Sequence, residues 1–438
     1  MDFRLKDFRY PSQIWRFRRF LAENEKRKPQ EIEAWQLTKL QEILKHAYSQ
    51  VPYYHCAFDK YNVKPSDLHH LSDLKKFPIL TKETVRGDAR SLQAKDFHKY
   101  DPVESYTSGS TGTALKFFLD RDTNVLEFAS LWRIFNWAGY HFGNRFCDLR
   151  GRTLSKDRLW SYDLRLNSLN LSSFNFKKEK MALYARLLKL FRPVMIRGYP
   201  SSISLLAQWF SELGINDIHP KTVVTSSETL LEHQRKIIEK VFDCKVLDYY
   251  GQMERVCLIS QCPQGSYHIH PEYGFVEILN EKGEPVKPGE VGEIVATSLH
   301  NKAMPFIRYR TRDLATFSNN HCLCDLPYKT IGKIYGRIED IVVTPDGRYV
   351  GRLDAAFKYS AGIRYAQIVQ DDVKSITVKI VKDDNYSQED TQKILAELRK
   401  RLGDIIKINI KFVKQISTTQ AGKFKFVISK VLSAGQKE

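Results

Sequence analysis

Residues 105–116 read Ser-Tyr-Thr-Ser-Gly-Ser-Thr-Gly-Thr-Ala-Leu-Lys, and the apolar run Phe117-Phe118-Leu119 follows directly. Gly109 and Gly112 permit backbone conformations that bring N–H groups close to an anion, and Lys116 adds a positive charge. The same stretch carries hydroxyl groups that can donate hydrogen bonds to phosphate oxygens, at Thr107, Ser108, Ser110 and Thr111. It lacks the terminal Gly-Lys-Ser/Thr of a Walker A loop. The pattern indicates a phosphate-binding loop, although its composition alone also fits a polar turn between two strands.

Length and composition indicate a globular chain of two or three domains. It has 438 residues, of which 42% are hydrophobic and 12% aromatic, and this excludes a disordered protein. No apolar run is long enough to span a bilayer, and the charged start Met1-Asp2-Phe3-Arg4 does not fit a signal peptide. The seven cysteines, an odd number, favour reduced thiols or a metal site over a disulfide framework. We expect a cytoplasmic protein.

The net charge of +18 raises the question of an anionic partner. Lysine and arginine are spread along the whole chain, and no nucleic-acid-binding motif is present, so we expect no nucleic-acid partner. The densest basic segment is Arg16-Phe17-Arg18-Arg19-Phe20 with Lys26-Arg27-Lys28. This basic, aromatic N-terminal segment fits a solvated helix face, and it also fits peripheral contact with the anionic inner face of a membrane.

Hydrophobic periodicity predicts an α/β fold. Apolar residues at three- and four-residue spacing predict helices over 31–50, 124–137 and 229–242. Short apolar or alternating stretches predict strands at 223–224, 246–247, 275–279 and 292–297. Strands that alternate with helices are typical of a parallel sheet.

The last hundred residues predict a separate small unit. Ile376, Val378 and Ile380 alternate as in a strand, an amphipathic helix follows over 394–402, and 406–412 gives a second strand. We therefore expect an α/β protein with a large multi-sheet N-terminal domain and a small, mobile C-terminal α+β domain. The expected domain limits are 1–335 for the large domain, with a helical segment at about 1–100, 336–345 for a hinge, and 346–438 for the small lid domain.

Further motifs follow the glycine-rich loop in a fixed order. They are Tyr249-Tyr250-Gly251-Gln252-Met253-Glu254, Ile307-Arg308-Tyr309-Arg310-Thr311-Arg312-Asp313, Gly336-Arg337-Ile338-Glu339-Asp340 and Gln420-Ala421-Gly422-Lys423-Phe424-Lys425. Together with residues 105–116, they make the chain resemble the adenylate-forming superfamily of acyl-CoA synthetases and related ligases. Val51-Pro52-Tyr53-Tyr54 and Pro78-Ile79-Leu80-Thr81-Lys82 make it most similar to the phenylacetate–coenzyme A ligase-like proteins, in the CapK-like capsular-polysaccharide-biosynthesis branch. The resemblance covers nearly the whole chain.

The resemblance implies a two-step reaction that uses ATP and Mg²⁺. A carboxylate attacks the α-phosphate of ATP and releases pyrophosphate, and a thiol or amine then takes the acyl group. The implied catalytic residues are Lys423, Glu254 and Thr107, with Lys423 at the carboxylate and α-phosphate and Glu254 on Mg²⁺. The residues implied to hold the phosphates are Ser108, Gly109, Ser110, Thr111, Gly112 and Lys116. Taken alone, Glu254 could be a surface acid beside Arg255, and Lys423 an exposed basic residue.

The resemblance also implies contacts with the nucleoside. Ser227 and Glu228 would pack against adenine, and Tyr249, Tyr250 and Gly251 would complete that part of the site. Asp313 would accept hydrogen bonds from the ribose hydroxyls, Arg337 would bind ribose or phosphate, and Glu339-Asp340 would form the hinge. The family usually has glycine before the ribose-binding aspartate, whereas this chain has Arg312.

Cysteine and histidine residues form a second group of candidates. Cys262, His268, Cys322 and Cys324 offer thiolate and imidazole ligands that suit tetrahedral Zn²⁺, and some phenylacetate–coenzyme A ligase-like proteins carry comparable positions. The Cys-x-Cys spacing at 322–324 is tighter than usual. Ordinary buried thiols are the alternative, and His270 and Glu272 could line an acyl pocket instead.

We therefore predict an AMP-forming ligase that acts on a small-molecule or sugar-linked carboxylic acid, with coenzyme A or an amine as acceptor, in surface polysaccharide biosynthesis. An arylacetate-type coenzyme A ligase and a catalytically degenerate ligase-fold scaffold are the alternatives. Arginines such as Arg197 are expected to lie on the surface unless they pair with a second carboxylate of the substrate.

Overall fold

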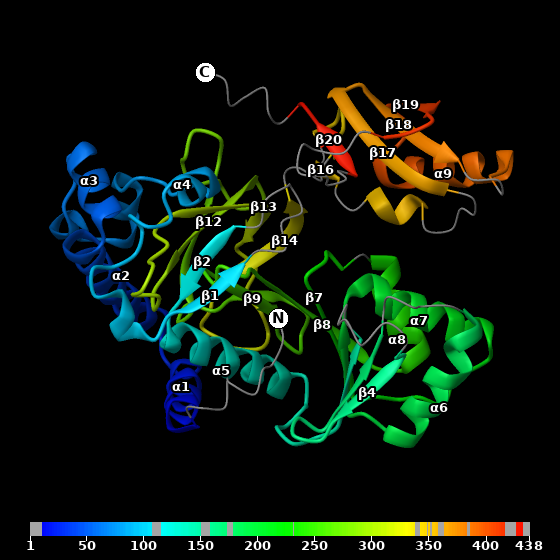
Figure 1. Ribbon diagram of the computed structural model, residues 1–438, viewed down its shortest axis with the longest axis horizontal. Helices are drawn as coiled ribbons and strands as arrows, with labels where there is room; N and C mark the ends of the chain where they lie inside the picture. The colour runs from blue at the N-terminus through cyan, green and yellow to red at the C-terminus, as the bar shows by residue number, and fades with distance from the viewer. Residues whose placement is uncertain are drawn as a thin grey trace.

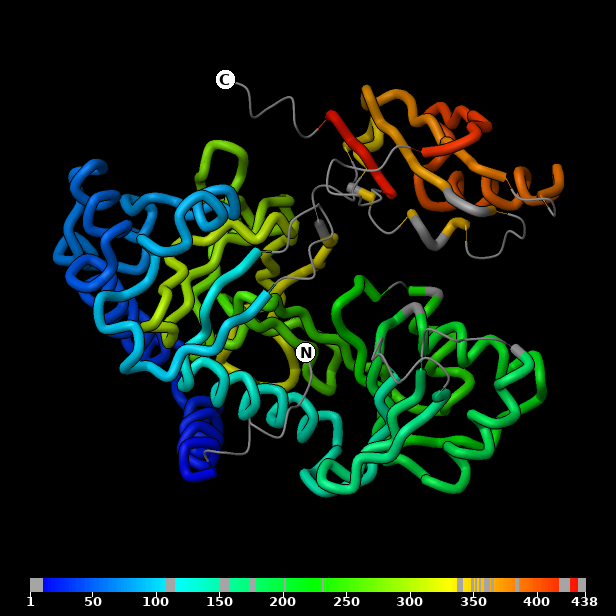
Figure 2. Tube along the Cα trace, viewed as in Figure 1, coloured from blue at the N-terminus to red at the C-terminus, as the bar shows by residue number. Residues whose placement is uncertain are grey.

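The computed structural model (Figures 1 and 2) describes most of the chain. The described residues are 11–106, 115–149, 158–172, 178–230, 232–337, 342–347, 349–350, 353–357, 363–382, 386–416 and 426–431. Six candidate residues of the glycine-rich loop, Thr107 to Gly112, lie outside these ranges, as do Lys423 and Glu339-Asp340.

Helices dominate the first hundred described residues. These are α1 (Pro11–Asn24), α2 (Pro29–Gln50), α3 (Pro52–Lys60) and α4 (Lys82–Gly87), with 3₁₀ helices at Pro65–Asp67, Leu71–Lys76 and Phe97–Tyr100. Pro29 and Pro52 stand in the first turn of α2 and α3, where the missing N–H costs no hydrogen bond. The predicted helix over 31–50 is confirmed, because its apolar residues form the buried side of α2.

Helix α1 contains most of the basic, aromatic N-terminal segment. Ile14, Phe17 and Leu21 are buried against helix α5 (Arg121–Trp137), and the guanidinium of Arg18 lies 3.9 Å from the ring centroid of Trp132 on α5. The aromatic residue Phe17 thus contributes to the core. None of the described helices is long and apolar enough to cross a membrane.

A mixed sheet of twelve strands runs through the centre of the large domain (Figure 1). In spatial order its strands are β11 (Gly274–Leu279), β12 (Val291–Ser298), β13 (Tyr309–Ser318), β14 (Thr330–Arg337), β10 (Tyr267–Ile269), β9 (Leu258–Gln261), β8 (Lys245–Gly251), β7 (Thr222–Ser226), β6 (Met195–Gly198), β3 (Phe146–Leu149), β5 (Ser168–Leu171) and β4 (Trp160–Asp163). The strands β8, β7, β6, β3 and β5 are parallel to their neighbours in that run. The predicted strands at 275–279 and 292–297 are confirmed as β11 and β12, which pair antiparallel.

Helices cover both faces of the parallel strands. Val224 and Leu247 pack toward α5, whereas their neighbours Val223 and Val246 pack on the opposite face. The helices on that opposite face are α6 (Met181–Phe191), α7 (Pro200–Glu212) and α8 (Glu232–Phe242), and a 3₁₀ turn at Lys178–Lys180 precedes them. Successive side chains of a strand point to opposite faces, so a strand covered on both sides carries apolar residues on both.

The antiparallel part of the sheet has its own core with the N-terminal helices. The hairpin of β1 (Val103–Tyr106) and β2 (Lys116–Leu119) packs there, and Tyr106 pairs with Lys116 at the ends that lead into the glycine-rich loop. The hairpin therefore fixes the two points at which that loop leaves and rejoins the fold.

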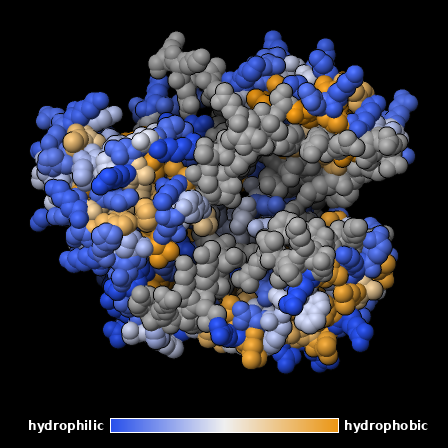
Figure 3. All heavy atoms as spheres, viewed as in Figure 1, coloured by the Kyte–Doolittle hydropathy of each residue, from blue (hydrophilic) through white to orange (hydrophobic). Residues whose placement is uncertain are grey.

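The C-terminal elements form a small α+β unit, which lies apart from the large sheet in Figure 1. Its elements are β15 (Val342–Val343), β16 (Tyr349–Val350), a 3₁₀ turn at Leu353–Phe357, β17 (Ile363–Asp372), β18 (Ser375–Lys382), α9 (Gln388–Leu402), β19 (Lys407–Phe412) and β20 (Val427–Ser429). A separate hydrophobic cluster holds α9 against the four-stranded sheet β19-β18-β17-β20. The predicted strands and helix of this unit are confirmed, while the predicted domain limits stay predictions. Hydrophilic side chains cover much of this unit and of the N-terminal helices on the face shown in Figure 3.

Candidate functional site

Two candidate segments follow the carboxyl ends of neighbouring parallel strands. Ser227 and Glu228 come directly after β7, and Gln252 to Glu254 come directly after β8. Open α/β sheets bind ligands beyond the carboxyl ends of their strands. Ser227 has a φ of 69°, a left-handed conformation that turns the chain sharply at the sheet edge. The segment predicted to contact the nucleoside and the segment predicted to bind the cation therefore lie side by side.

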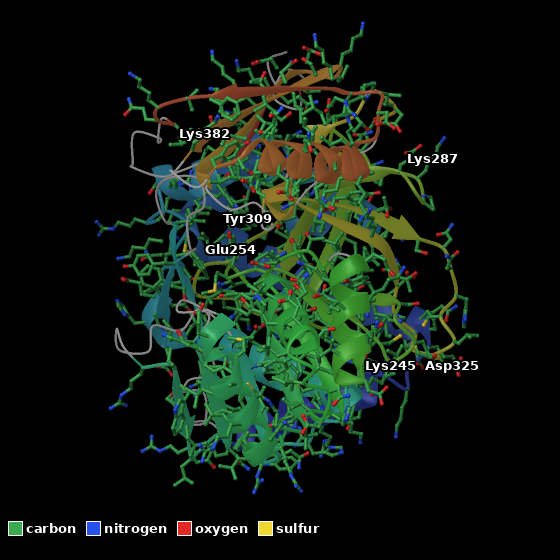
Figure 4. All side chains as sticks on the ribbon, turned by 90° about the vertical axis from the view of Figure 1, so that its right-hand side faces the viewer. Lys245, Glu254, Lys287, Tyr309, Asp325 and Lys382 are labelled. Carbon is green, nitrogen blue, oxygen red and sulfur yellow. The ribbon has the colours of Figure 1, made fainter. Side chains whose placement is uncertain are left out.

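Glu254 is held by a tyrosine from a distant part of the chain. It lies in the turn between β8 and β9 and is 5% exposed. The hydroxyl of Tyr309, the first residue of β13, donates a hydrogen bond of 2.7 Å to Oε1 of Glu254 (Figure 4). Burial raises the pKa of the Tyr309 phenol, and the Glu254 carboxyl raises it further. The hydroxyl therefore keeps its proton and serves as the hydrogen-bond donor. The buried position rules out the alternative that Glu254 is a surface acid.

Asp313 has a similar arrangement. The hydroxyl of Tyr250 donates to its Oδ2 at 2.7 Å, and Nε2 of Gln252 donates to the Tyr250 hydroxyl at 2.7 Å. Burial, followed by the nearby Asp313 charge, raises the pKa of Tyr250 well above its usual value. The structure thus joins the predicted ribose-binding aspartate to the segment that carries Glu254.

Strand β14 completes this corner of the site. Arg337 stands opposite Asp313 in the β13–β14 ladder, although the structure describes only its main chain. Gly336 has a φ of 93°, and a Cβ at this position would lie 3.2 Å from Oγ1 of Thr229. The segment after β7 therefore approaches β14 closely. This brings the residues predicted to contact adenine near the residues predicted to contact ribose.

Arg312 takes the conformation that a glycine would adopt more easily. Its φ is 68°, and its N–H donates to Oε1 of Glu293 at 3.0 Å. This left-handed residue accounts physically for the glycine that the family usually has there. Arg312 lies within β13, where the pairing with β12 shifts register, and the strand continues through Asp313.

Several predicted site residues are placed differently or lie outside the described part. Lys116 is exposed and pairs with Glu104, with Nζ 2.6 Å from Oε2. Tyr249 is buried in the core with residues of α5, and its role at the cofactor stays a prediction. Gly251 ends β8 next to Tyr250. Thr107, Ser108, Gly109, Ser110, Thr111, Gly112 and Lys423 lie outside the described residues, and their roles stay predictions.

Asp248 is a buried carboxyl on β8 near the site. It accepts hydrogen bonds from Oγ1 of Thr225 at 2.5 Å and from the hydroxyl of Tyr267 at 2.7 Å. Burial raises the pKa of this carboxyl to about 6, because the two hydrogen bonds offset only part of the loss of water. Sequence patterns gave no sign of this group, because it lies inside an ordinary strand.

Replacing Asp248 by asparagine should change how stability depends on pH. The pKa of this aspartate is about 4 in the unfolded chain and about 6 in the folded protein. Between these values the unfolded chain is ionised and the folded protein is not, so the wild-type protein loses stability as pH rises. The asparagine side chain does not titrate, so we expect the stability of Asp248→Asn to change little over this pH range, whereas the wild-type protein loses about 3 kcal/mol. Thermal midpoints measured across this pH range test the prediction. Asp217→Asn, at an exposed carboxylate, should retain the wild-type slope, whereas parallel curves for Asp248→Asn and wild type would contradict the prediction.

Four predicted metal ligands meet at the opposite end of β8. Cys262 follows β9, His268 lies on β10, and Cys322 and Cys324 lie in the β13–β14 connection. Their ligand atoms all lie within 4.8 Å of one another, with Sγ of Cys262 3.5 Å from Sγ of Cys322 and Sγ of Cys324 3.3 Å from Nε2 of His268. In Figure 4, Asp325 and Lys245 mark this region, well away from Glu254 and Tyr309.

This arrangement suits a tetrahedral metal ion. Zn–S and Zn–N bonds of about 2.3 and 2.0 Å place ligand atoms roughly 3.3–3.8 Å apart around zinc. Nδ1 of His268 lies 3.2 Å from the main-chain oxygen of residue 328, which leaves Nε2 directed at the cluster. Two neighbours in the sequence lie outside this cluster. Sγ of Cys257 is 3.1 Å from Nε2 of Gln252, and His270, a candidate for the acyl pocket, contacts Ser260 and Arg133.

The structure corrects the expectation that Arg197 lies on the surface, and it shows a second buried arginine, Arg133. Arg197 on β6 is 1% exposed, and its Nη2 lies 2.6 Å from Oδ2 of Asp148 on the neighbouring strand β3. Arg133 on α5 binds Glu272 at 3.0 and 3.2 Å. Pairing with an internal carboxylate lets a guanidinium be buried, and sequence spacing does not reveal such a partner.

The fold matches that of a solved ligase. The structure of 2-hydroxyisobutyryl-CoA ligase in the postadenylation state, in complex with R3-HIB-AMP, matches it with a TM-score of 0.68 over 95% of this chain and 94% of that chain, at 19% identity. The predicted fold class, an α/β protein with a small C-terminal α+β domain, is confirmed as that of the adenylate-forming ligases.

Sequence comparison shows which proteins this chain resembles. Residues 342–430 match the family described as the CapK C-terminal domain. Protein CapK of Staphylococcus aureus is 24% identical over 379 residues, 82% of this chain and 81% of the relative. Phenylacetate-coenzyme A ligase of Escherichia coli K12 is 29% identical over 337 residues, 72% of each chain. The predicted relationship to adenylate-forming, phenylacetate–coenzyme A ligase-like and CapK-like proteins is confirmed.

Proposed function

We propose that this protein is an ATP-dependent, AMP-forming ligase that activates a carboxylic acid. The carboxylate oxygen attacks the α-phosphorus of ATP, the bond to the β-phosphate breaks, and pyrophosphate leaves. A thiol or amine then attacks the acyl carbon of the adenylate, and AMP leaves. The observation that carries the proposal is the convergence of Glu254, Asp313 and the segment after β7 at the carboxyl ends of β7 and β8.

Each described group in this corner suits one part of ATP. Glu254 is a buried carboxylate, a ligand type that fits Mg²⁺, and the ion would neutralise charge on the phosphates when bound. Asp313 would accept hydrogen bonds from ribose hydroxyls, and Ser227 and Glu228 would border adenine. Lys423 and the glycine-rich loop, on the evidence of their motifs, would contact the reacting carboxylate and the phosphates.

The relatives support coenzyme A as the acceptor. Proteins named phenylacetate-coenzyme A ligase and 2-hydroxyisobutyryl-CoA ligase stand among them, and both names specify a thiol. The similarity to CapK supports a role in surface polysaccharide biosynthesis, in which an amine of a sugar or amino acid would replace the thiol. A cytoplasmic location and membrane contact of the basic N-terminal segment stay predictions.

We further propose that Cys262, His268, Cys322 and Cys324 bind one structural Zn²⁺. Three observations support this: the spacing of the ligand atoms, the burial of Cys262 and His268, and the second contact of the histidine ring. The ion would tie the β9–β10 hairpin to the β13–β14 connection. Metal analysis of the purified full-length protein tests the proposal, with one zinc per chain as the expected result.

Carboxylate-dependent ATP–pyrophosphate exchange tests the proposed activity. We expect exchange with one class of acid in a panel of aryl, fatty, amino and uronic acids. Lys423→Ala should abolish exchange while ATP binding persists, because the point charge at the reacting oxyanions is lost. Exchange with arylacetates alone would favour the arylacetate-type ligase. Absence of both ATP binding and exchange in the wild-type protein would contradict the proposal and favour the degenerate scaffold.

A further inference from the structure

The pair of Tyr309 and Glu254 has a feature that neither motif suggests. Both side chains are buried, at 0% and 5% exposure, and the phenol occupies only Oε1 of the carboxylate. Among the residues that the structure describes, none donates a hydrogen bond to Oε2 of Glu254. One oxygen of Glu254 is therefore fixed by the protein, while the other is left for a ligand. This arrangement favours cation binding, because a carboxylate without such an anchor loses rotamer freedom when it binds the ion.

Tyr309 is itself fixed by the N-terminal part of the chain. Leu80 forms an isolated parallel bridge with Tyr309, in which the Leu80 N–H donates to the oxygen of Arg308 and the Arg310 N–H donates to the oxygen of Leu80, both at 3.0 Å. The ring of Phe306 packs edge-on against Tyr309 at a centroid distance of 5.0 Å. These contacts fix the main chain of Tyr309 and support its ring next to Glu254.

The guanidinium of Arg308 strengthens this connection. It donates to the main-chain oxygens of Lys75 and Phe77 at 3.0 and 2.7 Å and binds the Glu277 carboxylate. Segment 75–80 is thus held by the Arg308 side chain as well as by the Leu80 bridge to β13. The Pro78-Ile79-Leu80-Thr81-Lys82 motif, which had no role of its own in the sequence, contains the bridging residue.

We propose that Tyr309 is a positioning residue that orients Glu254 toward the cation that accompanies ATP, an inference that rests on the proposed function. Tyr309 touches neither the nucleotide nor the ion. It acts through Oε1 of Glu254, and the bridge to Leu80 keeps the phenol in place. The N-terminal segment thereby contributes to cation binding without lining the site.

Mn²⁺ affinity in the presence of ATP is the measurement that tests this role, and the full-length Tyr309→Phe protein is the main variant. We expect its Mn²⁺ dissociation constant and its Mg²⁺ requirement for exchange to rise about tenfold or more, with metal-free ATP affinity unchanged. Tyr273→Phe is the matched control, because it also removes a buried tyrosine–glutamate hydrogen bond, the one to Glu127. It should lower the thermal midpoint similarly but leave Mn²⁺ affinity at the wild-type value.

Two further variants keep the result interpretable. In Glu254→Gln, adding Tyr309→Phe should cause no further loss of Mn²⁺ affinity, because the two residues act as one unit. Leu80→Pro, which removes the N–H that binds Arg308, should weaken Mn²⁺ binding in the same direction as Tyr309→Phe. Equal Mn²⁺ affinities for wild type and a folded Tyr309→Phe would overturn the inference. If wild type binds Mn²⁺ with ATP but exchanges no pyrophosphate with any acid of the panel, the Mn²⁺ comparison still decides the role of Tyr309, because it does not depend on turnover.

Discussion

Replacing Glu254 by glutamine is expected to reduce carboxylate-dependent ATP–pyrophosphate exchange by at least about a hundredfold. Glutamine keeps the size of the side chain, and its Oε1 can still accept the hydrogen bond from Tyr309. The substitution therefore removes the negative charge while preserving the shape of the site. Without that charge, Mg²⁺ would be held less well against the phosphates when pyrophosphate leaves.

Glu127→Gln is the matched control for this experiment. Glu127 is also buried and also accepts a hydrogen bond from a buried tyrosine, Tyr273, but it lies on α5 outside the proposed site. It should keep exchange activity near the wild-type level. Exchange by Glu254→Gln within a few-fold of wild type would show that Glu254 does not hold the cation. Thermal midpoints of both variants establish that the comparison is between folded proteins.

The second large effect is expected at the metal cluster. Replacing Cys262 and Cys324 together by serine should release the zinc and lower the free energy of unfolding by on the order of 4 kcal/mol or more. Two of four ligands would be lost, and a serine hydroxyl is a poor substitute for a thiolate. The β13–β14 connection would then lose its tie to the β9–β10 hairpin. Metal content and thermal midpoint, measured on the same preparation, give the result.

Two other cysteines separate loss of metal from loss of packing. Cys56 is exposed, and Cys147 is buried on β3 outside the cluster. Cys56→Ser should change neither zinc content nor stability, and Cys147→Ser should lower stability with zinc content unchanged. A wild-type protein that stays free of zinc after refolding with Zn²⁺ would contradict the proposed metal site. A double variant no less stable than Cys147→Ser would contradict its structural role.

The candidate site was only partly predictable from the motifs. Glu254 and Asp313 were named from the sequence, and the structure places their segments together through the hydrogen bonds from Tyr309 and Tyr250. Tyr309 stood in a quoted motif without an assigned role, because its partner lies 55 positions away. The motif does not separate Tyr249 from Tyr250, although adjacent strand residues point to opposite faces and Tyr249 lies in the core with residues of α5.

By itself, the sequence determined the helices and strands with clear periodicity, the α+β character of the C-terminal unit and the four cysteine and histidine residues that the structure brings together. These features are local, because they depend on neighbouring residues or on ligand types that few other chemistries use. Only the tertiary structure decided the order of the strands, the burial of Asp248, the pairing of Arg197 with Asp148 and the contact between Tyr309 and Glu254. Each of these depends on two segments far apart in the chain. Their contact is set by sheet order and packing, which no local spacing of residues encodes.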